Sequence, residues 1–246
     1  MSKTKYISIS SQKGGVGKST ITTLIASHFH FTTPLKVVVV DCDYPQWTVE
    51  NFRQDELELF KKTPEKMAEF KAFGKKAYAI LKCQVKDARE QLEDLEGAVD
   101  LVLVDTPGTL NIAGIPELWR KLDYIFIPIE PDAATINSTL AYTDVLRHYT
   151  NQPDSSLKGF YCFWNKFVKS EKQTFFNQTE KIFQEEGVTL LASRLEQSVA
   201  YRKSEVRSTM TPMRKEFYHL GIKSLIEEIQ AIVFPVKEAA SVTEPA

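Results

Sequence analysis

Apolar residues along this chain gather in short runs that are hydrophobic on both faces. One run, for example, places four consecutive valines before Asp41. A strand that is covered on both sides of a parallel sheet has this composition, whereas a half-exposed strand alternates apolar and polar residues. The pattern therefore predicts six buried strands, at residues 6–10, 35–41, 101–105, 124–130, 159–165 and 188–195.

The segments between most of these strands have helical spacing. After the first strand, apolar or aromatic side chains recur at positions i, i+3, i+4 and i+7, and they are Ile21, Leu24, Ile25 and His28. Strands and helices that alternate in this way predict right-handed crossovers. We therefore predict an α/β fold with a doubly wound, mostly parallel sheet flanked by helices. In such a sheet, ligands bind at the residues that directly follow the strands.

The segment 50–98 interrupts this alternation, because it is about three times longer than an ordinary helical crossover. Thr63 and Pro64 have the chemistry of an N-cap and a first helical residue. Apolar residues then recur every three or four positions as far as Leu95, which predicts one long helix, or two helices with a break near Gly74. Two interpretations of this helical insertion stay open: a layer over the sheet, which we favour, or a surface on which a partner docks.

Composition and length indicate one ordinary globular domain. The chain has 246 residues, of which 43% are hydrophobic and 26% charged, and this is enough for one sizeable core. We expect a single domain over residues 1–234 and a disordered tail over 235–246. The start of the chain lacks the apolar core of a signal peptide, and no apolar run approaches the roughly 18–20 residues of a membrane span. We therefore expect a cytoplasmic protein.

Charge and cysteine content exclude some classes of function. The formal net charge of -1 gives no overall basic field, so any binding of nucleic acid must use a local patch or an assembled dimer. The three cysteines, Cys42, Cys83 and Cys162, are odd in number and far apart in the sequence. This argues against a disulfide framework or a metal site of paired cysteines, and indicates reduced thiols.

The sequence KGGVGKST lies between the first predicted strand and the first predicted helix. Its glycines allow a tight turn in which successive backbone N–H groups point at phosphate oxygens, and the helix amino terminus adds its dipole. Lys18 offers a charge to the outer phosphates, and Ser19 a hydroxyl suited to Mg²⁺. The usual motif has glycine where this chain has Gln12, but the loop has the strand and helix that the motif requires. The predicted nucleotide-binding residues here are Gly14, Gly15, Val16, Gly17, Lys18, Ser19 and Thr20.

Three aspartates follow predicted strands. Asp105 ends an apolar run and continues into the sequence TPG, as does the Walker B carboxylate that holds Mg²⁺ in P-loop proteins. Asp41 and Asp43 end the second strand, and their spacing of two would point them to opposite faces of a continuing strand, so we expect different duties for them. A single aspartate at a strand end is most often a turn or cap residue. Three of them together with a glycine-rich lysine loop favour catalysis.

The sequences QKGGVGKST, VVVVDCD, LVLVDTPG and YIFIPIEPD, taken in this order, resemble the ParA/MinD family of deviant Walker A ATPases, in the SIMIBI class of P-loop NTPases. The resemblance runs from about Lys5 to Val233, and it implies ATP and Mg²⁺ as cofactors. In this family, the lysine that corresponds to Lys13 reaches across a nucleotide-sandwich dimer to phosphates bound by the other subunit. The resemblance therefore implies an ATP-dependent homodimer, in which the added cation neutralises phosphate charge as an arginine finger does.

The resemblance also implies a role for each residue that would touch phosphate or metal. Lys18 and the backbone amides of residues 15–20 would bind the phosphates, and Ser19 would ligate Mg²⁺ directly. Asp105 and Asp41 would act in the outer shell of the ion.

Two further residues match family positions around the reacting phosphate and the base. Asp43 corresponds to the aspartate that orients the attacking water, so the implied catalytic residues are Lys13, Lys18 and Asp43. Asn165 corresponds to an asparagine that reads the adenine edge in many relatives, although a simple strand cap is an alternative. This chain departs from the family pattern DxDPQ by carrying Tyr44 before the proline. Hydrolysis in the family is slow and acts as a timer.

A P-loop does not identify the cargo, and other features must separate the candidates. Attachment to a membrane, as in MinD, requires a basic amphipathic C-terminal helix, whereas the apolar stripe from Leu220 to Val233 has Glu227 and Glu228 on its opposite face. The chain has neither the paired cysteines of iron–sulfur relatives nor the tyrosine-rich tail of bacterial tyrosine kinases of this class. We therefore expect no membrane partner.

A local basic cluster lies near the C-terminal end of an otherwise near-neutral chain. Such a surface loop is most often only solvated, but ParA relatives bind nonspecific DNA through basic residues in this part once ATP has dimerised them. A dimer doubles the number of phosphates contacted, and affinity rises steeply with that number. Residues 208–212 also resemble the family loop that borders the nucleotide base. The DNA-binding candidates are Arg202, Lys203, Arg207, Arg214 and Lys215.

The resemblance is to the short ParA proteins, since the glycine loop begins near residue 13 and leaves no room for an N-terminal helix-turn-helix. It implies a dimeric ATPase that segregates or positions plasmid or mobile-element DNA, associates with the bacterial nucleoid when ATP is bound, and has a ParB-like or other small adaptor protein as partner. One alternative is an accessory ATPase of a conjugative element, or a regulator, in which ATP gates protein contacts only. Another is an ATP-sensing scaffold that scarcely hydrolyses.

Overall fold

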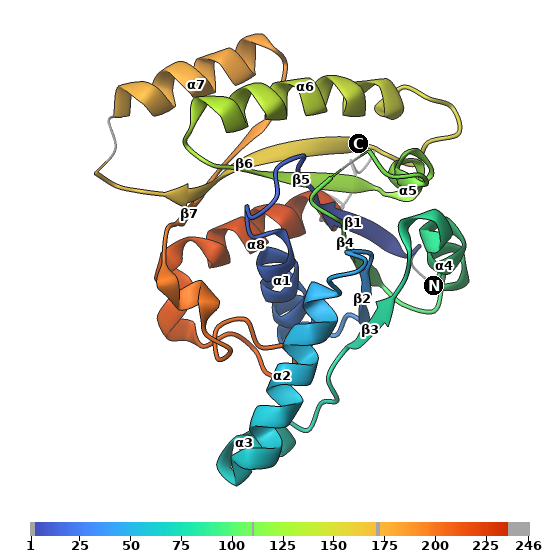
Figure 1. Cartoon of the computed structure of the whole chain (residues 1–246), viewed down its shortest axis with the longest axis vertical. Helices are drawn as coiled ribbons and strands as arrows, with labels where there is room; N and C mark the ends of the chain where they lie inside the picture. The colour runs from blue at the N-terminus through green and yellow to red at the C-terminus, as the bar shows by residue number, and fades with distance from the viewer. Residues whose placement is uncertain (1–2, 110, 171–172, 236–246) are drawn as a thin grey trace, which may run out of the picture.

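A computed structural model of the chain describes residues 3–109, 111–170 and 173–235, so that most of the predicted tail lies outside the described residues. Its seven strands form one parallel sheet in the order β3-β2-β4-β1-β5-β6-β7, with helices on both faces (Figure 1). The predicted α/β fold is confirmed, and six of the strands match the predicted runs. The strands are β1 (Lys5–Ile9), β2 (Val37–Asp41), β3 (Ala79–Lys82), β4 (Leu101–Asp105), β5 (Tyr124–Ile129), β6 (Gly159–Phe167) and β7 (Leu190–Glu196).

Two cores, one on each face, explain why the strands are apolar throughout. Along β2, Val37 and Val39 belong to one core, while Val38 and Val40 belong to the other. The first core lies under α1 (Lys18–Thr32) and α8 (Ile222–Val233). The second lies under four helices, α4 (Ala88–Asp94), α5 (Ile115–Lys121), α6 (Ala133–Thr150) and α7 (Gln173–Glu185). No helix within the described ranges is long and apolar enough to cross a membrane.

The segment between β2 and β4 differs from its prediction beyond Gly74. Helix α3 (Pro64–Ala72) follows Thr63 as expected, but a second helix, α2 (Thr48–Lys62), precedes it. The predicted continuous helix after Gly74 is wrong, because the chain there forms β3, which pairs in parallel with β2 at the edge of the sheet. Leu81 and Val85 are four positions apart, so their spacing fits a helix, and a strand of four residues shows too little alternation to outweigh it.

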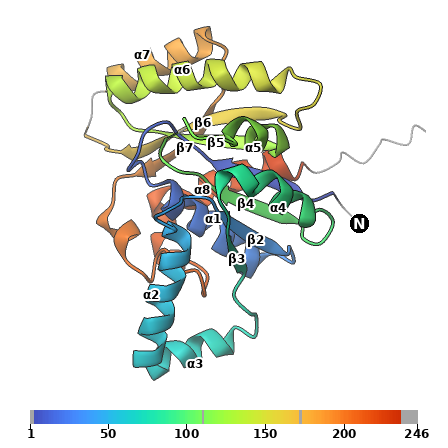
Figure 2. The ribbon, with the colours of Figure 1, turned by 45° about the vertical axis from the view of Figure 1, so that its right-hand side comes forward.

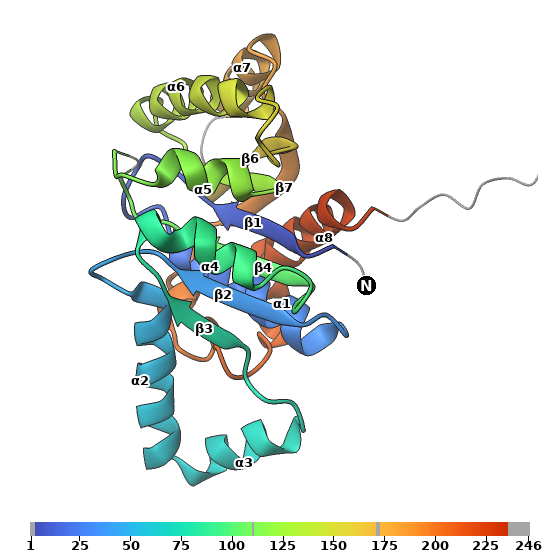
Figure 3. The same cartoon turned by 90° about the vertical axis from the view of Figure 1, so that its right-hand side faces the viewer.

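Helices α2 and α3 form an arm (residues 48–72) that projects from the sheet, as the views in Figures 1, 2 and 3 agree. Helix α3 has no buried residue. By contrast, Ala88 and Leu92 of α4 are fully buried against the sheet. The favoured interpretation of a layer over the sheet therefore holds for α4 but not for α3. Three short 3-10 helices complete the described elements: η1 (Val85–Asp87), η2 (Val199–Arg202) and η3 (Lys215–Leu220).

Candidate nucleotide-binding site

The loop between β1 and α1 encloses the side chain of Lys18. Gly15 and Gly17 have φ angles of 76° and 84°, a left-handed conformation that favours glycine, and Gly17 is the N-cap of α1. The ammonium of Lys18 lies 3.5 Å from the carbonyl oxygen of Lys13, and burial lowers its pKa. A tight backbone turn, a helix amino terminus and a buried ammonium meet here, and all three attract phosphate.

The loop that follows β4 packs against this glycine loop. A Cβ atom added to Gly108 would lie 3.2 Å from the Cα of Gly14, so the close approach of the two loops favours glycine. Asp105, the last residue of β4, is fully buried, and its Oδ2 accepts a hydrogen bond of 2.6 Å from the Ser19 hydroxyl. The structure thus brings together Ser19 and Asp105, the two residues predicted to serve the metal most closely.

The carboxyl group of Asp105 fits a site for a cation. Its Oδ1 has no hydrogen-bond partner, and burial raises the pKa of the group to about 8. Burying an ionised carboxylate in this position costs free energy unless a positive charge lies next to it. Among the described residues, no group of three or more histidine, cysteine, aspartate or glutamate side chains could hold a metal ion by itself. Mg²⁺ at Ser19 and Asp105 would therefore need further ligands from phosphate oxygens and water.

Asp41 and Asp43 have different surroundings, although both are at the end of β2. Asp41 is fully buried and lies opposite Asp105 in the register of β2 and β4. Its carboxylate accepts hydrogen bonds from three backbone N–H groups, those of Asp43, Val49 and Glu50. Asp41 therefore fixes the amino end of α2 close to Asp105, one of the two residues predicted to hold the metal. Asp43 is half-buried, and its Oδ2 accepts a hydrogen bond of 2.9 Å from the Thr48 hydroxyl.

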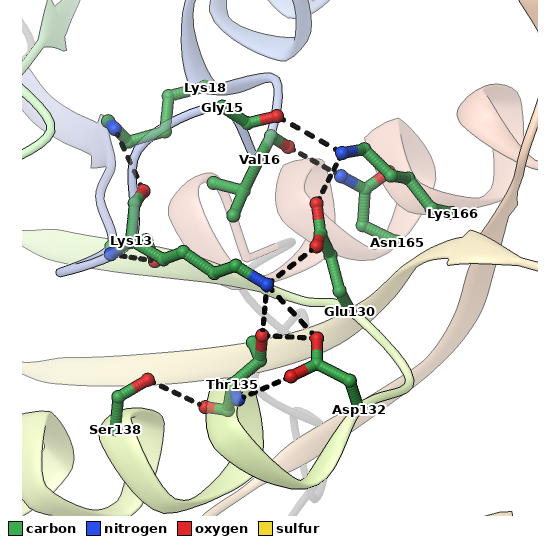
Figure 4. Close-up of polar contacts among 11 residues, drawn as sticks. Lys13, Gly15, Val16, Lys18, Glu130, Asp132, Thr135, Ser138, Asn165 and Lys166 are labelled. Carbon is green, nitrogen blue, oxygen red and sulfur yellow. Dashed lines mark hydrogen bonds and ion pairs between the residues drawn. The ribbon is translucent and has the colours of Figure 1, made fainter.

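The second lysine of the loop extends away from Lys18 (Figure 4). The Lys13 ammonium lies 2.9 Å from Oε2 of Glu130 and 3.0 Å from Oδ2 of Asp132, and it donates to the Thr135 hydroxyl at 2.7 Å. Glu130 follows β5, while Asp132 is the N-cap of α6. Hydrogen bonding to Glu130 raises the pKa of Lys13, which is therefore a cation held by its own chain.

Two residues at the end of β6 also hold the glycine loop (Figure 4). The Asn165 side chain donates to the carbonyl oxygen of Val16 at 2.6 Å, and the Lys166 ammonium donates to that of Gly15 at 3.1 Å. Lys166 also forms an ion pair with Glu130. Asn165 is thus placed beside the glycine loop, as its predicted role requires, with its amide engaged by the backbone.

A cavity of about 290 Å³ adjoins the glycine loop on the side of Asn165. Tyr201, Arg202 and Arg207 form part of its wall, and the Arg207 guanidinium lies 3.9 Å from the centre of the Phe52 ring. Its position next to the phosphate loop makes this cavity the candidate site for the base and ribose of a nucleotide. Two of the five DNA-binding candidates, Arg202 and Arg207, therefore line this cavity. The other three, Lys203, Arg214 and Lys215, are exposed and lie outside this wall.

A buried polar network that sequence reasoning missed connects the arm to the loop after η2. Glu56 of α2 is only 4% exposed, and it binds the Ser208 hydroxyl, the N–H of Thr209 and the Thr209 hydroxyl. Arg53, one turn earlier, donates to the hydroxyl and the carbonyl oxygen of Thr209. We call these four residues the Glu56 network. The spacing of Arg53 and Glu56 indicates a shared helix face, but only the fold reveals their distant partners.

The fold and the loop around Lys18 define a P-loop nucleotide-binding protein of the doubly wound α/β class. The particular family follows from a family model, described as the CobQ/CobB/MinD/ParA nucleotide binding domain, which matches residues 7–233. The chain belongs to this family, and it is an ATPase of the ParA/MinD type. The resemblance inferred from the motifs is thereby confirmed.

Three solved structures illustrate which proteins have a similar fold. A chain of a MinC:MinD cell division protein complex from Aquifex aeolicus has a TM-score of 0.65 and 15% identity, over 95% of this chain and 98% of that one. An ATP complex of a McdA variant from Cyanothece has a TM-score of 0.62 and 15% identity, covering 97% and 99%. A plasmid partition protein from Borrelia burgdorferi, bound to AMPPNP, has a TM-score of 0.60 and 16% identity, covering 93% and 100%. No curated protein sequence matches the chain.

Proposed function

We propose that this chain is a ParA-type ATPase that dimerises when it binds ATP, binds DNA nonspecifically, and segregates or positions plasmid or mobile-element DNA. The observation that carries the proposal is the division between the two lysines of the glycine loop. Lys18 is enclosed by the loop, whereas the Lys13 ammonium lies outside it on Glu130 and Asp132. A cation that does not serve the phosphates of its own subunit could serve those of a second copy once it leaves these two carboxylates.

Each residue around the phosphate loop has a proposed task in hydrolysis. Lys18 and the loop amides would bind ATP, and Ser19 with Asp105 would hold Mg²⁺, which neutralises charge on the outer phosphate oxygens when bound. Asp43 would orient the attacking water, and Asp41 would act in the outer shell of the ion. Lys13 of the second copy would add positive charge to the transferring phosphate. Because this last charge arrives only in the dimer, hydrolysis would time the lifetime of the dimer.

The proposed DNA surface consists of Lys203, Arg214 and Lys215. These side chains are exposed and lie outside the cavity beside the glycine loop, whereas Arg202, which is also exposed, and the half-buried Arg207 form part of the wall of that cavity. The net charge of -1 gives the single chain little attraction for DNA. Two copies of the surface in a dimer would bind far more strongly than one, because each neutralised phosphate releases counterions. A ParB-like or other small adaptor protein would then stimulate hydrolysis and release the DNA.

The projecting arm supports a second candidate function, in which ATP gates protein contacts only, as in an accessory ATPase of a conjugative element. A cleft of about 500 Å³ lies between the arm and the segment 204–214, and Phe73, the residue that directly follows the arm, is 50% exposed. Both features are open to a protein partner.

Binding of random-sequence duplex DNA separates these two functions. The experiment uses Asp43→Ala, which is expected to retain ATP and the dimer, and compares ATP with ADP at two salt concentrations. The DNA carrier predicts salt-sensitive binding with ATP only, and a smaller salt dependence when Lys203, Arg214 and Lys215 are all changed to alanine. Dimerisation without any DNA binding would reject the DNA role and favour the function in protein contacts.

A further inference from the structure

Two cysteines from distant parts of the sequence are neighbours at the edge of the sheet. Cys42 follows the last residue of β2, and Cys83 follows the last residue of β3. The two strands pair in parallel with Asp41 opposite Lys82, and the N–H of Cys83 donates to the carbonyl oxygen of Asp41 at 3.0 Å. Cys42 and Cys83 are thus the next pair in register. Neighbouring strands lie about 4.8 Å apart, which is within the range of Cα separations that disulfides span.

The two thiols also lie on the same face of the sheet. Both side chains belong to the core under α4. The sulfur of Cys83 lies 3.3 Å from the carbonyl oxygen of Gln84. Both cysteines are reduced in the structure. Cys162 is a reduced cysteine as well, but it is fully buried on β6, and it therefore serves as a matched control.

A small cavity adjoins this pair. It measures about 180 Å³ and has Cys42, Gln84 and Pro107 in its wall, while Cys83 lies outside that wall and is itself 7% exposed. One water molecule occupies about 30 Å³ of liquid, so hydrogen peroxide has room in this cavity.

We propose that Cys42 and Cys83 form an oxidative modification site, at which hydrogen peroxide closes a disulfide beside the loop that carries Asp43. The Cys83 thiolate, from the more exposed cysteine, attacks one peroxide oxygen: an S–O bond forms, the O–O bond breaks, and the released hydroxide takes a proton to become water. The Cys42 sulfur then attacks the sulfur of Cys83. The S–S bond forms, the S–O bond breaks, and the departing hydroxide becomes water with the Cys42 proton. Two thiols are oxidised by two electrons, and one peroxide is reduced to two waters.

The disulfide would restrain the nucleotide side of the sheet. Asp43 directly follows Cys42, and η1 directly follows Gln84, so the bond would tie the loop after β2 to the segment before α4. Both cysteines directly follow their strands, and their N–H groups donate to the carbonyl oxygens of Asp105 and Asp41, so the bond would form at the end of the ladder that carries these aspartates. The oxidised protein is therefore expected to lose ATPase activity reversibly. The modification itself does not depend on the proposed role in DNA positioning.

Intact-protein mass spectrometry of the full chain tests the site. After treatment with hydrogen peroxide and alkylation under denaturing conditions, the wild type and Cys162→Ala are expected to have lost two hydrogen atoms and to keep Cys42 and Cys83 unalkylated. Dithiothreitol should restore both thiols. Cys42→Ala and Cys83→Ala should form no intramolecular bond. Peptide mapping of the oxidised wild type locates the bond without any variant, and should place it between Cys42 and Cys83.

An unchanged number of alkylated thiols in the treated wild type, or a bond that involves Cys162, would overturn the proposal. The ATPase rate then tests the consequence for the loop. The rate of the treated wild type is expected to fall and to recover with dithiothreitol, while Cys83→Ala keeps its own rate after the same treatment. Equal rates for the oxidised and the reduced wild type would show that the bond does not restrain the site.

Discussion

The Lys13 ammonium lies 2.9 Å from Oε2 of Glu130, and the other carboxylate oxygen of Glu130 pairs with Lys166. Glu130 therefore connects the end of β5 to two lysines around the glycine loop. Lys13 would have to leave this carboxylate before it could contact a second subunit. The contact within one chain thus competes with the proposed contact between chains.

Replacing Glu130 should shift this competition toward the dimer. We expect Glu130→Gln to dimerise at an ATP concentration about two- to fivefold lower than the wild type, since an ion pair of this exposure is worth about 0.2–1 kcal/mol. Sedimentation velocity across an ATP titration measures the shift. Glu117→Gln, a carboxylate on α5 whose side chain is 51% exposed, is the matched control and should behave as the wild type. A higher ATP requirement for Glu130→Gln would show that the carboxylate assists dimerisation instead.

The pKa of Asp105 predicts a pH dependence of stability without nucleotide. Burial raises the pKa in the folded chain from 3.8 to about 8, so the folded state holds this proton more tightly than the unfolded state does. This contribution to stability is complete below the unfolded pKa and is lost as the pH rises toward 8, by at most about 1.4 kcal/mol per pH unit. Between pH 3.8 and about 8, the wild type should therefore lose stability relative to Asp105→Asn. At higher pH, the difference in stability between the two proteins should stay constant.

Thermal unfolding of both proteins without nucleotide or Mg²⁺ measures this difference. Asp144→Asn, whose side chain is 65% exposed on α6, should follow the wild type at every pH. A difference between the wild type and Asp105→Asn that does not change with pH would contradict the assigned environment of Asp105.

The Glu56 network should stabilise the fold through buried hydrogen bonds. Glu56→Ala leaves the N–H of Thr209 and two hydroxyl groups without their partner, so we expect a loss of about 1–3 kcal/mol in the free energy of unfolding. Urea unfolding measures this loss. Glu58→Ala, on the same helix but with a side chain 61% exposed, should change the free energy by less than about 0.5 kcal/mol. Equal effects of the two substitutions would reject the network as a stabilising contact.

Sequence patterns predicted the centre of the site well, because its residues are adjacent to strands that are apolar on both faces. The strand before Asp105 was predicted with its observed bounds, and the glycine loop lies between β1 and α1 as expected. Loops at the carboxyl ends of parallel strands converge, so the proximity of Ser19 and Asp105 follows from the topology alone. The local sequence motifs were thus sufficient to predict where the glycine loop, Ser19 and Asp105 lie.

Features that depend on distant partners could not be predicted in this way. β3 is a strand only because β2 offers it an edge, and its own four residues fit a helical spacing equally well. Arg202 and Arg207 belong to a basic cluster in the sequence, but in the fold both line the cavity beside the glycine loop. Cys42 and Cys83 are far apart in the chain and become neighbours only through the pairing of β2 with β3.

Sedimentation velocity tests the central claim, that ATP joins two copies through Lys13. The measurement compares Asp43→Ala with the double variant Lys13→Ala/Asp43→Ala, each with ATP and with ADP. Asp43→Ala should be a dimer with ATP and a monomer with ADP, and Lys169→Ala, an exposed lysine changed in the same background, should leave this unchanged. The double variant should still bind ATP through Lys18 and stay a monomer with both nucleotides. An ATP-dependent dimer of the double variant would contradict the account.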